Sequence, residues 1–528
     1  MLVKTFAAAV HGIDAQTITI EVDAGGAVAQ GKPGYSLVGL PDSAVREGYW
    51  RIESALKSVG YRIPRIKIVI NMAPADLRKE GSNYDLPLAI GVMAATQQIP
   101  ASMVQEYLIM GEVSLDGTIL PIKGALPIAI QARKEGFKGF ILPRANAREA
   151  AIVNELPIFG VENIDEVIGF FEGRTKLEQT IVNTREEFAA AQRMESVDFS
   201  DVRGQENIKR ALEIAAAGGH NVILIGPPGS GKTMLAKRLP TILPPLTLHE
   251  ALETTKIHSV VGLLPSNASL VTARPFRCPH HTISDVALVG GGNVPKPGEI
   301  SLAHNGVLFL DELPEFQRQV LEVLRQPIEA RQITISRSRF TVDYPASFML
   351  IAAMNPCPCG FYNDPNKECQ CAPGVVQKYL NKISGPLLDR IDLHVEVTPV
   401  SYDELADAPS GDKTASSTQT AAERSTDILQ RVVRARARQE ERFLQQIGTH
   451  CNAQMESQQI RRVCALDAAS QALLKRAMER LQLSARAYDR ILKVARTIAD
   501  LADSENIRTE HIAEAIHYRS LDRESWGS

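Results

Sequence analysis

The sequence has neither a long hydrophobic segment nor an excess of one charge. No run of about 18 or more apolar residues occurs in the 528-residue chain, so we expect no membrane-spanning segment. The apolar run after Lys4 is too short for a secretory signal peptide, and we therefore expect a cytosolic protein. The formal net charge of −3 excludes a chain-wide basic surface, so any binding of nucleic acid must use a local one.

Disulfides are not expected, because cytosolic thiols stay reduced. The chain has seven cysteines, and four of them form the pattern C-x-C-x₉-C-x-C at Cys357, Cys359, Cys369 and Cys371. Four soft ligands on a short loop suit tetrahedral Zn²⁺, although C-x-C is tighter than the usual C-x₂-C spacing. We therefore predict a structural zinc loop over residues 355–373, with ordinary reduced thiols as the alternative.

The texture of the sequence changes along its length, and no internal repeat is found. At about 150 residues per domain, a chain of 528 residues suggests roughly three domains. Short β-like runs alternate with helical patterns at first, apolar strands with glycine-rich turns and helices follow as in α/β folds, and the end is helical. We predict an N-terminal domain, a linker, an α/β domain, a mobile loop with a basic helix, and a helical C-terminal domain over residues 1–172, 173–199, 200–400, 401–446 and 447–528.

Residues 226–233 read GPPGSGKT, which matches the P-loop pattern. The apolar strand NVILI precedes them and the helix-like TMLAKRL follows, and this strand–loop–helix context argues against a simple glycine-rich turn. The glycines let backbone N–H groups turn toward phosphate oxygens, while the lysine supplies positive charge and the threonine a hydroxyl for Mg²⁺. We assign ATP binding to Gly226, Pro227, Pro228, Gly229, Ser230, Gly231, Lys232 and Thr233.

A second element, GVLFLDEL at 306–313, ends in two acidic residues. Its apolar run predicts a parallel strand that is buried on both faces. Asp311 and Glu312 would then lie at the carboxyl edge of the sheet, where α/β folds bind ligands. We expect Asp311 to hold Mg²⁺ and Glu312 to orient the attacking water, and a solvent-facing acidic pair is the weaker alternative.

A third apolar strand, FMLIAAMN, ends in Asn355, whose amide can bond the attacking water and the γ-phosphate. With the two elements above it resembles the AAA+ ATPase module, in which Asn355 matches sensor 1 and VRGQENIKRALEIAAAG the lead-in helix. The resemblance also implies an arginine finger in SGPLLDRIDL, at Arg390, and a sensor 2 in the lid helix LSARAYDRILKVARTIADL, at Arg486. Without the resemblance, each arginine would be interpreted as a surface salt bridge.

Further stretches narrow the resemblance to one family. RPFRCPHHTIS, AAMNPCPCG and the two arginine-containing segments resemble the ComM/YifB family of magnesium-chelatase-like AAA+ ATPases, along essentially the whole chain. The resemblance implies a Mg²⁺- and ATP-dependent ring, a hexamer of identical chains. In this family, ComM proteins act as DNA helicases that promote branch migration during natural transformation. The fold class it implies is α/β: an AAA+ P-loop module with a helical C-terminal lid, preceded by a Lon-protease-like α+β domain.

A local basic surface is predicted between Asp311 and Asn355. RQITISRSRFTVDYP, residues 331–345, has the β-branched content of a hairpin, with Arg337 and Arg339 near its tip. Such arginines, repeated around a ring, would concentrate charge against DNA phosphates. A second basic stripe, with Glu440 and Glu441 nearby, is better interpreted as a salt-bridged helix face; it comprises Arg431, Arg434, Arg438 and Arg442.

Cys278, His280 and His281 offer ligand-type side chains in RPFRCPHHTIS. Adjacent histidines rarely point to one metal, and no further ligands are near in sequence. We therefore favour a structural or pore-loop use of this segment over a metal site.

The N-terminal region contains LRKEGSNYDLPLAIGV and GEVSLDGTILPIKGALPIA, which resemble the catalytic domain of Lon protease. That enzyme uses a serine–lysine dyad, but the two positions fall on Asn83 and Leu126 here, with Ser82 and Lys123 nearby. We expect a non-proteolytic scaffold. A chelatase-type ATPase serving a metallotetrapyrrole partner, a Lon-like peptidase and a non-enzymatic ATP-gated scaffold remain as alternatives to the DNA motor.

Overall fold

The computed structural model describes residues 1–26, 34–191, 197–265, 268–292, 295–337, 340–362, 367–372, 374–399, 423–446 and 448–519. The loop predicted to be mobile, within 401–422, and Arg339 lie outside these ranges. The chain divides into two compact units, Met1–Gln192 with Thr247–Thr272, and Arg193–Leu246 with Ala273–Ser528. In the part of the chain described, no helix is both long and apolar enough to cross a membrane.

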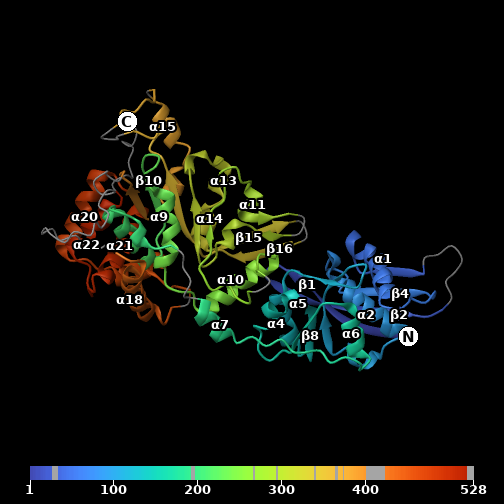
Figure 1. Cartoon of the computed structure of the whole chain (residues 1–528). Helices are drawn as coiled ribbons and strands as arrows, with labels where there is room; N and C mark the ends of the chain where they lie inside the picture. The colour runs from blue at the N-terminus through green and yellow to red at the C-terminus, as the bar shows by residue number, and fades with distance from the viewer. Residues whose placement is uncertain are drawn as a thin grey trace, which may run out of the picture. The chain divides into compact units, whose positions relative to one another are not determined.

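The first unit is built on a seven-stranded sheet in the order β3-β4-β2-β1-β5-β8-β9 (Figure 1). The long hairpin of β1 and β2 is antiparallel, whereas β5, β8 and β9 are parallel to one another. Alternating burial along β2 follows the alternation of its sequence, as a strand with one covered face requires. The strands are β1 (Leu2–His11), β2 (Asp14–Ala24), β3 (Tyr35–Val38), β4 (Ile68–Ala73), β5 (Tyr107–Ile109), β8 (Gly139–Pro143) and β9 (Ile158–Val161).

Helices of the first unit pack on this sheet. Helix α2 is buried on all sides, in keeping with its apolar sequence DLPLAIGVMAA, and it contacts β1, β2 and α1. The helices and the short 3₁₀ turn that precedes α2 are α1 (Ser43–Ser58), η1 (Ser82–Tyr84), α2 (Asp85–Ala95), α4 (Ala125–Glu135), α5 (Arg144–Ala150), α6 (Ile164–Phe171) and α7 (Thr184–Ala191).

One segment of the first unit comes from the middle of the chain. Helix α10 (Leu248–Val261) packs against α4, although our division of the sequence places it in the 200–400 domain. The contact is specific, because the hydroxyl of Ser259 donates to the buried carboxylate of Glu149, and the N–H of Gly124 donates to Ser259 O at 3.0 Å. A polar pair buried in this way fixes the segment to the N-terminal unit.

The second unit has a five-stranded sheet in the order β11-β14-β17-β10-β18, and its pairings are parallel. β14 and β17 are buried along their whole length, which confirms the prediction from their apolar runs. Residues that follow β10, β14 and β17 therefore meet at one edge of the sheet. The strands are β10 (Val222–Ile225), β11 (Phe276–Arg277), β14 (Val307–Leu310), β17 (Met349–Met354) and β18 (Leu393–Glu396).

Smaller elements surround this sheet. The hairpin predicted at 331–345 is confirmed, since β15 (Gln332–Arg337) pairs antiparallel with β16 (Phe340–Pro345). Further elements are α8 (Glu206–Gly218), α9 (Lys232–Arg238), α11 (Asp285–Val289), β12 (Gly290–Gly291), β13 (Lys296–Pro297), α12 (Glu299–Leu302), η4 (Leu313–Glu315), α13 (Arg318–Glu322), α14 (Arg325–Ala330) and α15 (Val375–Leu380).

The end of the chain is helical, as predicted. Helix α21 packs against α8, α18 and α22 in one hydrophobic core with β10 and β17 (Figure 1). The helices are α18 (Ser425–Phe443), α19 (Ser457–Val463), α20 (Ala468–Leu481), α21 (Ala485–Leu501) and α22 (Thr509–His517). The parallel α/β sheet and this helical region confirm those parts of the predicted fold class.

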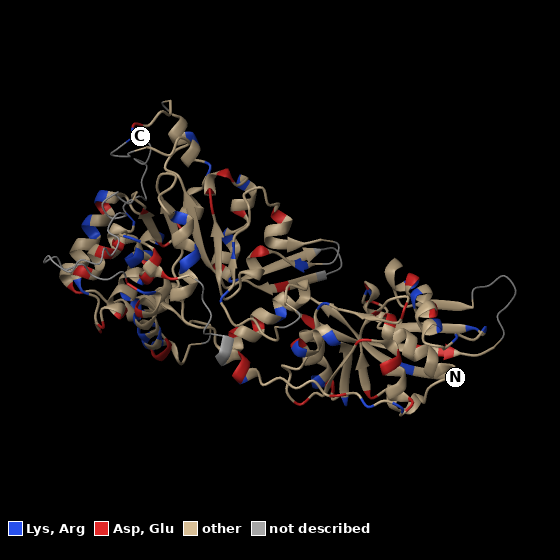
Figure 2. Cartoon of the chain, viewed as in Figure 1, with Lys and Arg blue, Asp and Glu red and all other residues tan. Residues whose placement is uncertain are grey.

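The arginines on α18 take part mainly in ion pairs. Arg431 pairs with Glu213 and Glu423, Arg438 with Asp503, and Arg442 with Asp500. Figure 2 shows basic and acidic residues interspersed over these helices. The structure therefore agrees with the interpretation of this stripe as a salt-bridged face.

Candidate active site

The P-loop connects β10 to α9 at the carboxyl edge of the sheet. Gly229 and Gly231 have φ values of +80° and +86°, in the left-handed region that favours glycine. A β-carbon at Gly226 would lie 2.2 Å from the carbonyl oxygen of Val397, so only glycine fits beside the end of β18. The loop therefore has the backbone freedom and the close packing that a phosphate cradle needs.

Lys232 begins α9, and its side chain turns back into the loop. The ammonium group donates to Gly226 O at 2.8 Å and to Pro227 O at 2.9 Å. It also donates to Oδ1 of Asn355 at 3.2 Å. Burial lowers the pKa of the Lys232 ammonium, and the carboxylate of Asp311 opposes this effect. The two residues that we predicted from separate strands are therefore brought together.

Thr233 and Asp311 also meet at this edge. The hydroxyl of Thr233, on α9, donates to Oδ2 of Asp311, just after β14, at 2.6 Å. A hydroxyl and a carboxylate placed side by side supply oxygen ligands of the type that Mg²⁺ prefers. The pair can thus hold Mg²⁺ next to the phosphate-binding loop.

Glu312 has an unusual backbone conformation. Its φ of 53° and ψ of 47° are left-handed, which costs a non-glycine residue about 1 kcal/mol. The turn exposes 59% of the side chain and brings Oε2 to 3.4 Å from Nδ1 of His281. Strain of this kind clusters at functional sites. The carboxylate is thus free of the core and within reach of a histidine that we had not assigned to the site.

Asn355 follows β17, which lies beside β10 in the sheet. Met354 pairs with Ile225, and the N–H of Gly226 donates to Met354 O at 3.2 Å, so Asn355 is placed directly beside the P-loop. This register explains how an amide 123 residues away in sequence contacts Lys232.

Gln205, at the start of α8, is a site residue that the sequence reading did not single out. Its side-chain amide donates to Ser230 O at 2.9 Å and to Thr398 O at 3.0 Å, which ties the P-loop to the end of β18. Its φ of 57° places it in a tight turn after Gly204. The dipeptide Gly-Gln before the helix was the available signal, and it lay inside the segment interpreted only as a lead-in helix.

Arg390 and Arg486 lie close to each other in the second unit. Arg390 is buried and pairs through Nε with Oε1 of Glu329 at 2.9 Å, and its Nη1 donates to Pro386 O at 2.6 Å. Arg486, on α21, is 3.8 Å from the carboxylate of Asp389, the residue before Arg390. Arg390 also lines an open cavity of about 510 Å³ with residues of α14 and β15.

The other predicted DNA-contacting residues are on the hairpin. Arg337 ends β15 and pairs with Phe340 of β16 in the backbone register, which places it at the turn. Arg339 falls outside the described residues.

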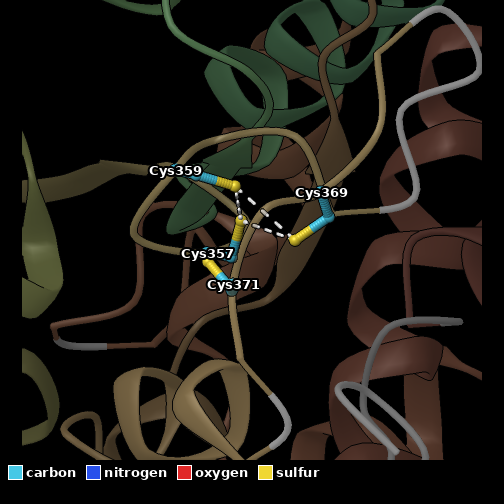
Figure 3. A group of neighbouring side chains, drawn as sticks. All are labelled: Cys357, Cys359, Cys369 and Cys371. Carbon is cyan, nitrogen blue, oxygen red and sulfur yellow. Dashed lines mark hydrogen bonds between the residues drawn. The ribbon is translucent and has the colours of Figure 1, made fainter.

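The four cysteines of the predicted zinc loop gather after β17 (Figure 3). The sulfur of Cys357 lies 3.3 Å from that of Cys359 and 3.8 Å from that of Cys369, and the last two are 3.5 Å apart. All four sulfurs lie within 4.8 Å of one another, and all are free thiols. A tetrahedron with Zn–S bonds of about 2.3 Å has edges of about 3.8 Å, so the group fits a zinc ion.

Cys278, His280 and His281 do not form a similar group. Within the described ranges, the four-cysteine cluster is the sole set of three or more Cys, His, Asp or Glu side chains with metal-like spacing. His281 instead faces Glu312, and Nδ1 of His280 lies 2.9 Å from the hydroxyl of Thr282. This agrees with the preference for a non-metal use of the segment.

The Lon-like positions lack a dyad. Asn83 lies in η1, where its carbonyl accepts from Gly111 N at 2.9 Å, and Leu126 is fully buried in α4. No hydrogen bond joins the Ser82 hydroxyl to Lys123, both of which the structure describes. The Lys123 side chain lies against Gly262, where a β-carbon would be 3.1 Å from its Cε.

Comparisons with known proteins agree with this geometry. Residues 198–405 match the family described as "Magnesium chelatase, subunit ChlI", residues 20–146 match "Subunit ChlI of Mg-chelatase", and residues 422–519 match "Magnesium chelatase, subunit ChlI C-terminal". The fold and the site therefore define an ATPase of the magnesium-chelatase-like AAA class.

Full-length relatives identify the family within that class. YifB of Escherichia coli (strain K12) is 45% identical over 512 residues, which cover 97% of this chain and 96% of YifB. Competence protein ComM of Haemophilus influenzae is 42% identical over 522 residues, 99% of this chain and 98% of ComM. The magnesium-chelatase 38 kDa subunit of Rhodobacter capsulatus is more distant, 25% identical over 177 residues that cover 30% of this chain and 50% of that subunit. The chain belongs to the ComM/YifB family of magnesium-chelatase-like proteins.

Proposed function

We propose that this protein is a Mg²⁺- and ATP-dependent ring motor that acts on DNA, as a helicase that promotes branch migration. The observation that carries the ATPase part is the meeting of side chains from three strand ends at one sheet edge. Thr233 contacts Asp311 at 2.6 Å, and Lys232 contacts Asn355 at 3.2 Å. Few arrangements other than a nucleotide site place a P-loop lysine, a hydroxyl–carboxylate pair and an amide together.

Each side chain has a role in hydrolysis that its position supports. The P-loop amides and Lys232 bind the phosphates, and Thr233 and Asp311 hold Mg²⁺, which neutralises phosphate charge when bound. Glu312 accepts a proton from the water whose oxygen attacks the γ-phosphorus, while the bond from that phosphorus to the β–γ bridging oxygen breaks. Asn355 orients the water and the γ-phosphate.

The DNA part of the proposal is supported by the hairpin and by the relatives. β15 and β16 form a two-stranded hairpin with Arg337 at its turn, and Arg339 follows in sequence. Arginines on hairpins around a ring would bind the phosphate backbone without a basic surface over the whole chain. One full-length relative is named as a competence protein, which links this family to DNA taken up by cells.

The ring part of the proposal concerns the two further arginines. We assign Arg390 as a finger that reaches the γ-phosphate held by a neighbouring chain, and Arg486 as sensor 2 on the lid helix. Arg390 lines an open cavity, and its ion pair with Glu329, which is 48% exposed, must break for the guanidinium to extend. We propose a hexamer, as the family resemblance implies.

The four-cysteine loop is proposed to hold one structural Zn²⁺. Its sulfur–sulfur distances of 3.3 to 3.8 Å suit four thiolates around one ion and are far longer than the bond of about 2.05 Å in a disulfide. Because Cys357 comes two residues after Asn355, the bound ion would fix the end of β17 and with it the position of the amide.

A chelatase-type ATPase that serves a tetrapyrrole partner is the second candidate, and the matches to magnesium-chelatase families favour it. ATP hydrolysis measured with no DNA and with forked, single-stranded and duplex DNA separates the two. A motor is expected to hydrolyse ATP faster with DNA, whereas a chelatase-type protein is expected to be indifferent to DNA. A peptidase is disfavoured by the missing dyad.

A further inference from the structure

His281 lies against the carboxylate that we assign to water activation. Its Nδ1 is 3.4 Å from Oε2 of Glu312. The imidazole is stacked on His280 with centroids 4.1 Å apart, and it meets the ring of Phe316 edge-on at 6.4 Å. Ring contacts with both neighbours limit the rotation of the imidazole, so the position of His281 decides where Glu312 is held.

The strand before His281 delivers it to the same sheet edge as Glu312. β11 pairs in parallel with β14, with Phe276 opposite Val307 and Arg277 opposite Leu308. Arg277 is anchored by two bonds to the carboxylate of Glu299, at 2.6 and 2.7 Å. A bidentate pair of this kind resists rotation, so the base of the segment is firmly placed.

The segment beyond His281 reaches the hairpin of β15 and β16. Ser284 caps α11, and β12 then pairs with β13. A β-carbon at Gly290 would lie 2.9 Å from Cδ1 of Ile335 on β15, which shows how closely the two segments pack. The buried hydroxyl of Tyr344, on β16, donates to Pro295 O at 2.7 Å.

We propose that His281 is a positioning residue that restrains Glu312, and that residues 278–298 transmit the position of the hairpin to it. This inference rests on the proposed function, because DNA bound at the hairpin is what would shift the segment. In the described state, His281 holds the Glu312 carboxylate by Nδ1. A displaced hairpin moves β12, β13 and α11, withdraws His281 and frees the carboxylate to accept a proton from water.

The direct test replaces the imidazole. In His281→Ala, we expect kcat without DNA to rise about three- to tenfold, since a hydrogen bond to a charged group of about this strength no longer holds Glu312. The ratio of DNA-stimulated to basal kcat should fall to about one, with KM for ATP unchanged. His281→Asn keeps an N–H donor close to the position of Nδ1 and should retain most of the parent ratio.

Two further variants separate restraint from general damage to the segment. Thr282→Ala is the matched control, because Thr282 is exposed, neighbours His281 and bonds to His280 rather than to Glu312. It should behave as the parent. Tyr344→Phe removes the hydroxyl bonded to Pro295 and should lower DNA stimulation while basal kcat and DNA affinity stay at the parent values.

The outcomes distinguish this inference from the proposed function. A parent that responds to DNA, combined with a His281→Ala variant whose basal kcat falls or stays equal and whose stimulation ratio is intact, would overturn the restraint. A parent whose hydrolysis ignores every DNA would overturn the DNA function. In that case, a raised basal kcat in His281→Ala would still support the restraint on Glu312.

Discussion

Side chains at the carboxyl edge of the second sheet are held in place by one another before any ligand is considered. The Lys232 ammonium is bonded to two P-loop carbonyls and to Asn355, while Thr233 is bonded to Asp311. Because these contacts join β10, β14 and β17, a change in one side chain shifts its partners. Glu312 differs, since its carboxylate is largely exposed and contacts only a histidine of another segment in the described state.

The first prediction concerns Glu312. Glu312→Gln keeps the phosphate cradle and should bind ATP as the parent does, but its kcat should fall by about 10² to 10⁴, the range for loss of a general base. Lys232→Ala should instead weaken ATP binding itself. Nucleotide binding by fluorescence titration and steady-state hydrolysis measure the two effects. Glu315→Gln, a nearby carboxylate 3.4 Å from Lys382, is the control; hydrolysis by Glu312→Gln at the parent rate would refute the assignment.

At this scale, the sequence was informative where chemistry and spacing coincide. Gly226 to Thr233, Asp311 and Asn355 follow apolar runs, and the parallel register brings them together as predicted. Gln205 and His281 were not predicted, because their roles depend on contacts across the fold. His281 reaches Glu312 only because β11 pairs with β14, and a two-residue strand leaves almost no periodic signal in the sequence.

At the scale of elements, the four-cysteine loop gives a prediction about metal content. Purified protein should contain about one zinc per chain, and Cys357→Ser with Cys369→Ser should remove the metal and lower the thermal midpoint, because metal binding is coupled to loop folding. Elemental analysis and thermal unfolding measure both. Cys278→Ser replaces a cysteine outside the cluster and should change neither. Metal-free parent protein from a zinc-replete preparation would contradict the site.

A buried charge network joins the sheet to α21. Asp392 is bonded to Nη1 of Arg490 at 2.8 Å and to the N–H of Asn221 at 3.0 Å, and Nδ1 of His220 is 3.5 Å away. Burial alone would raise the pKa of Asp392, but Arg490, His220 and Lys493 outweigh burial and hold the pKa well below its usual value. The ionised carboxylate therefore stabilises the packing of the lid helix on the strands.

The network gives a pH-dependent prediction. The pKa of Asp392 is lower in the folded chain than the value of about 3.9 in the unfolded chain, so its stabilisation is present above about pH 4 and is lost as the pH falls further. Asp392→Asn should destabilise the protein by about 3–5 kcal/mol at pH 7, as expected when a buried pair is broken. The difference in thermal midpoint from the parent should narrow below about pH 4. An equal difference at pH 7 and pH 3 would contradict the account.

Strands and helices with a continuous pattern were predictable, and an inserted element was not. The runs VILI, VLFL and MLIAAM became β10, β14 and β17, and ALLKRAMERLQL lies in or next to α20. Helix α10 was placed in the wrong unit because its neighbours in sequence belong to the ATPase unit. Only the buried pair of Glu149 and Ser259 reveals where it packs, and a pair that far apart in sequence carries no local signal.

At the scale of the whole molecule, the proposed ring makes each site depend on two chains. Arg390→Ala should abolish hydrolysis, and mixing it with Glu312→Gln chains should restore part of the activity at interfaces that combine an intact finger with an intact Glu312. Hydrolysis across mixing ratios, with mixed rings demonstrated by two affinity tags, measures this. Arg434→Ala, on the exposed face of α18, is a control that should not need rescue. No rescue in demonstrated mixed rings would contradict a finger that acts between chains.

The central claim is that the hairpin of β15 and β16 couples ATP hydrolysis to DNA. The most direct measurement compares DNA-stimulated ATP hydrolysis and DNA binding in the parent and in Arg337→Ala with Arg339→Ala, over a series of salt concentrations and with Arg434→Ala as control. The account predicts intact basal hydrolysis, lost stimulation, weaker binding to all sequences, and a salt slope lower by about 0.7 for each phosphate contact removed from single-stranded DNA. Equal weak binding of forked DNA by parent and double variant at low salt, with hydrolysis indifferent to DNA in both, would contradict it.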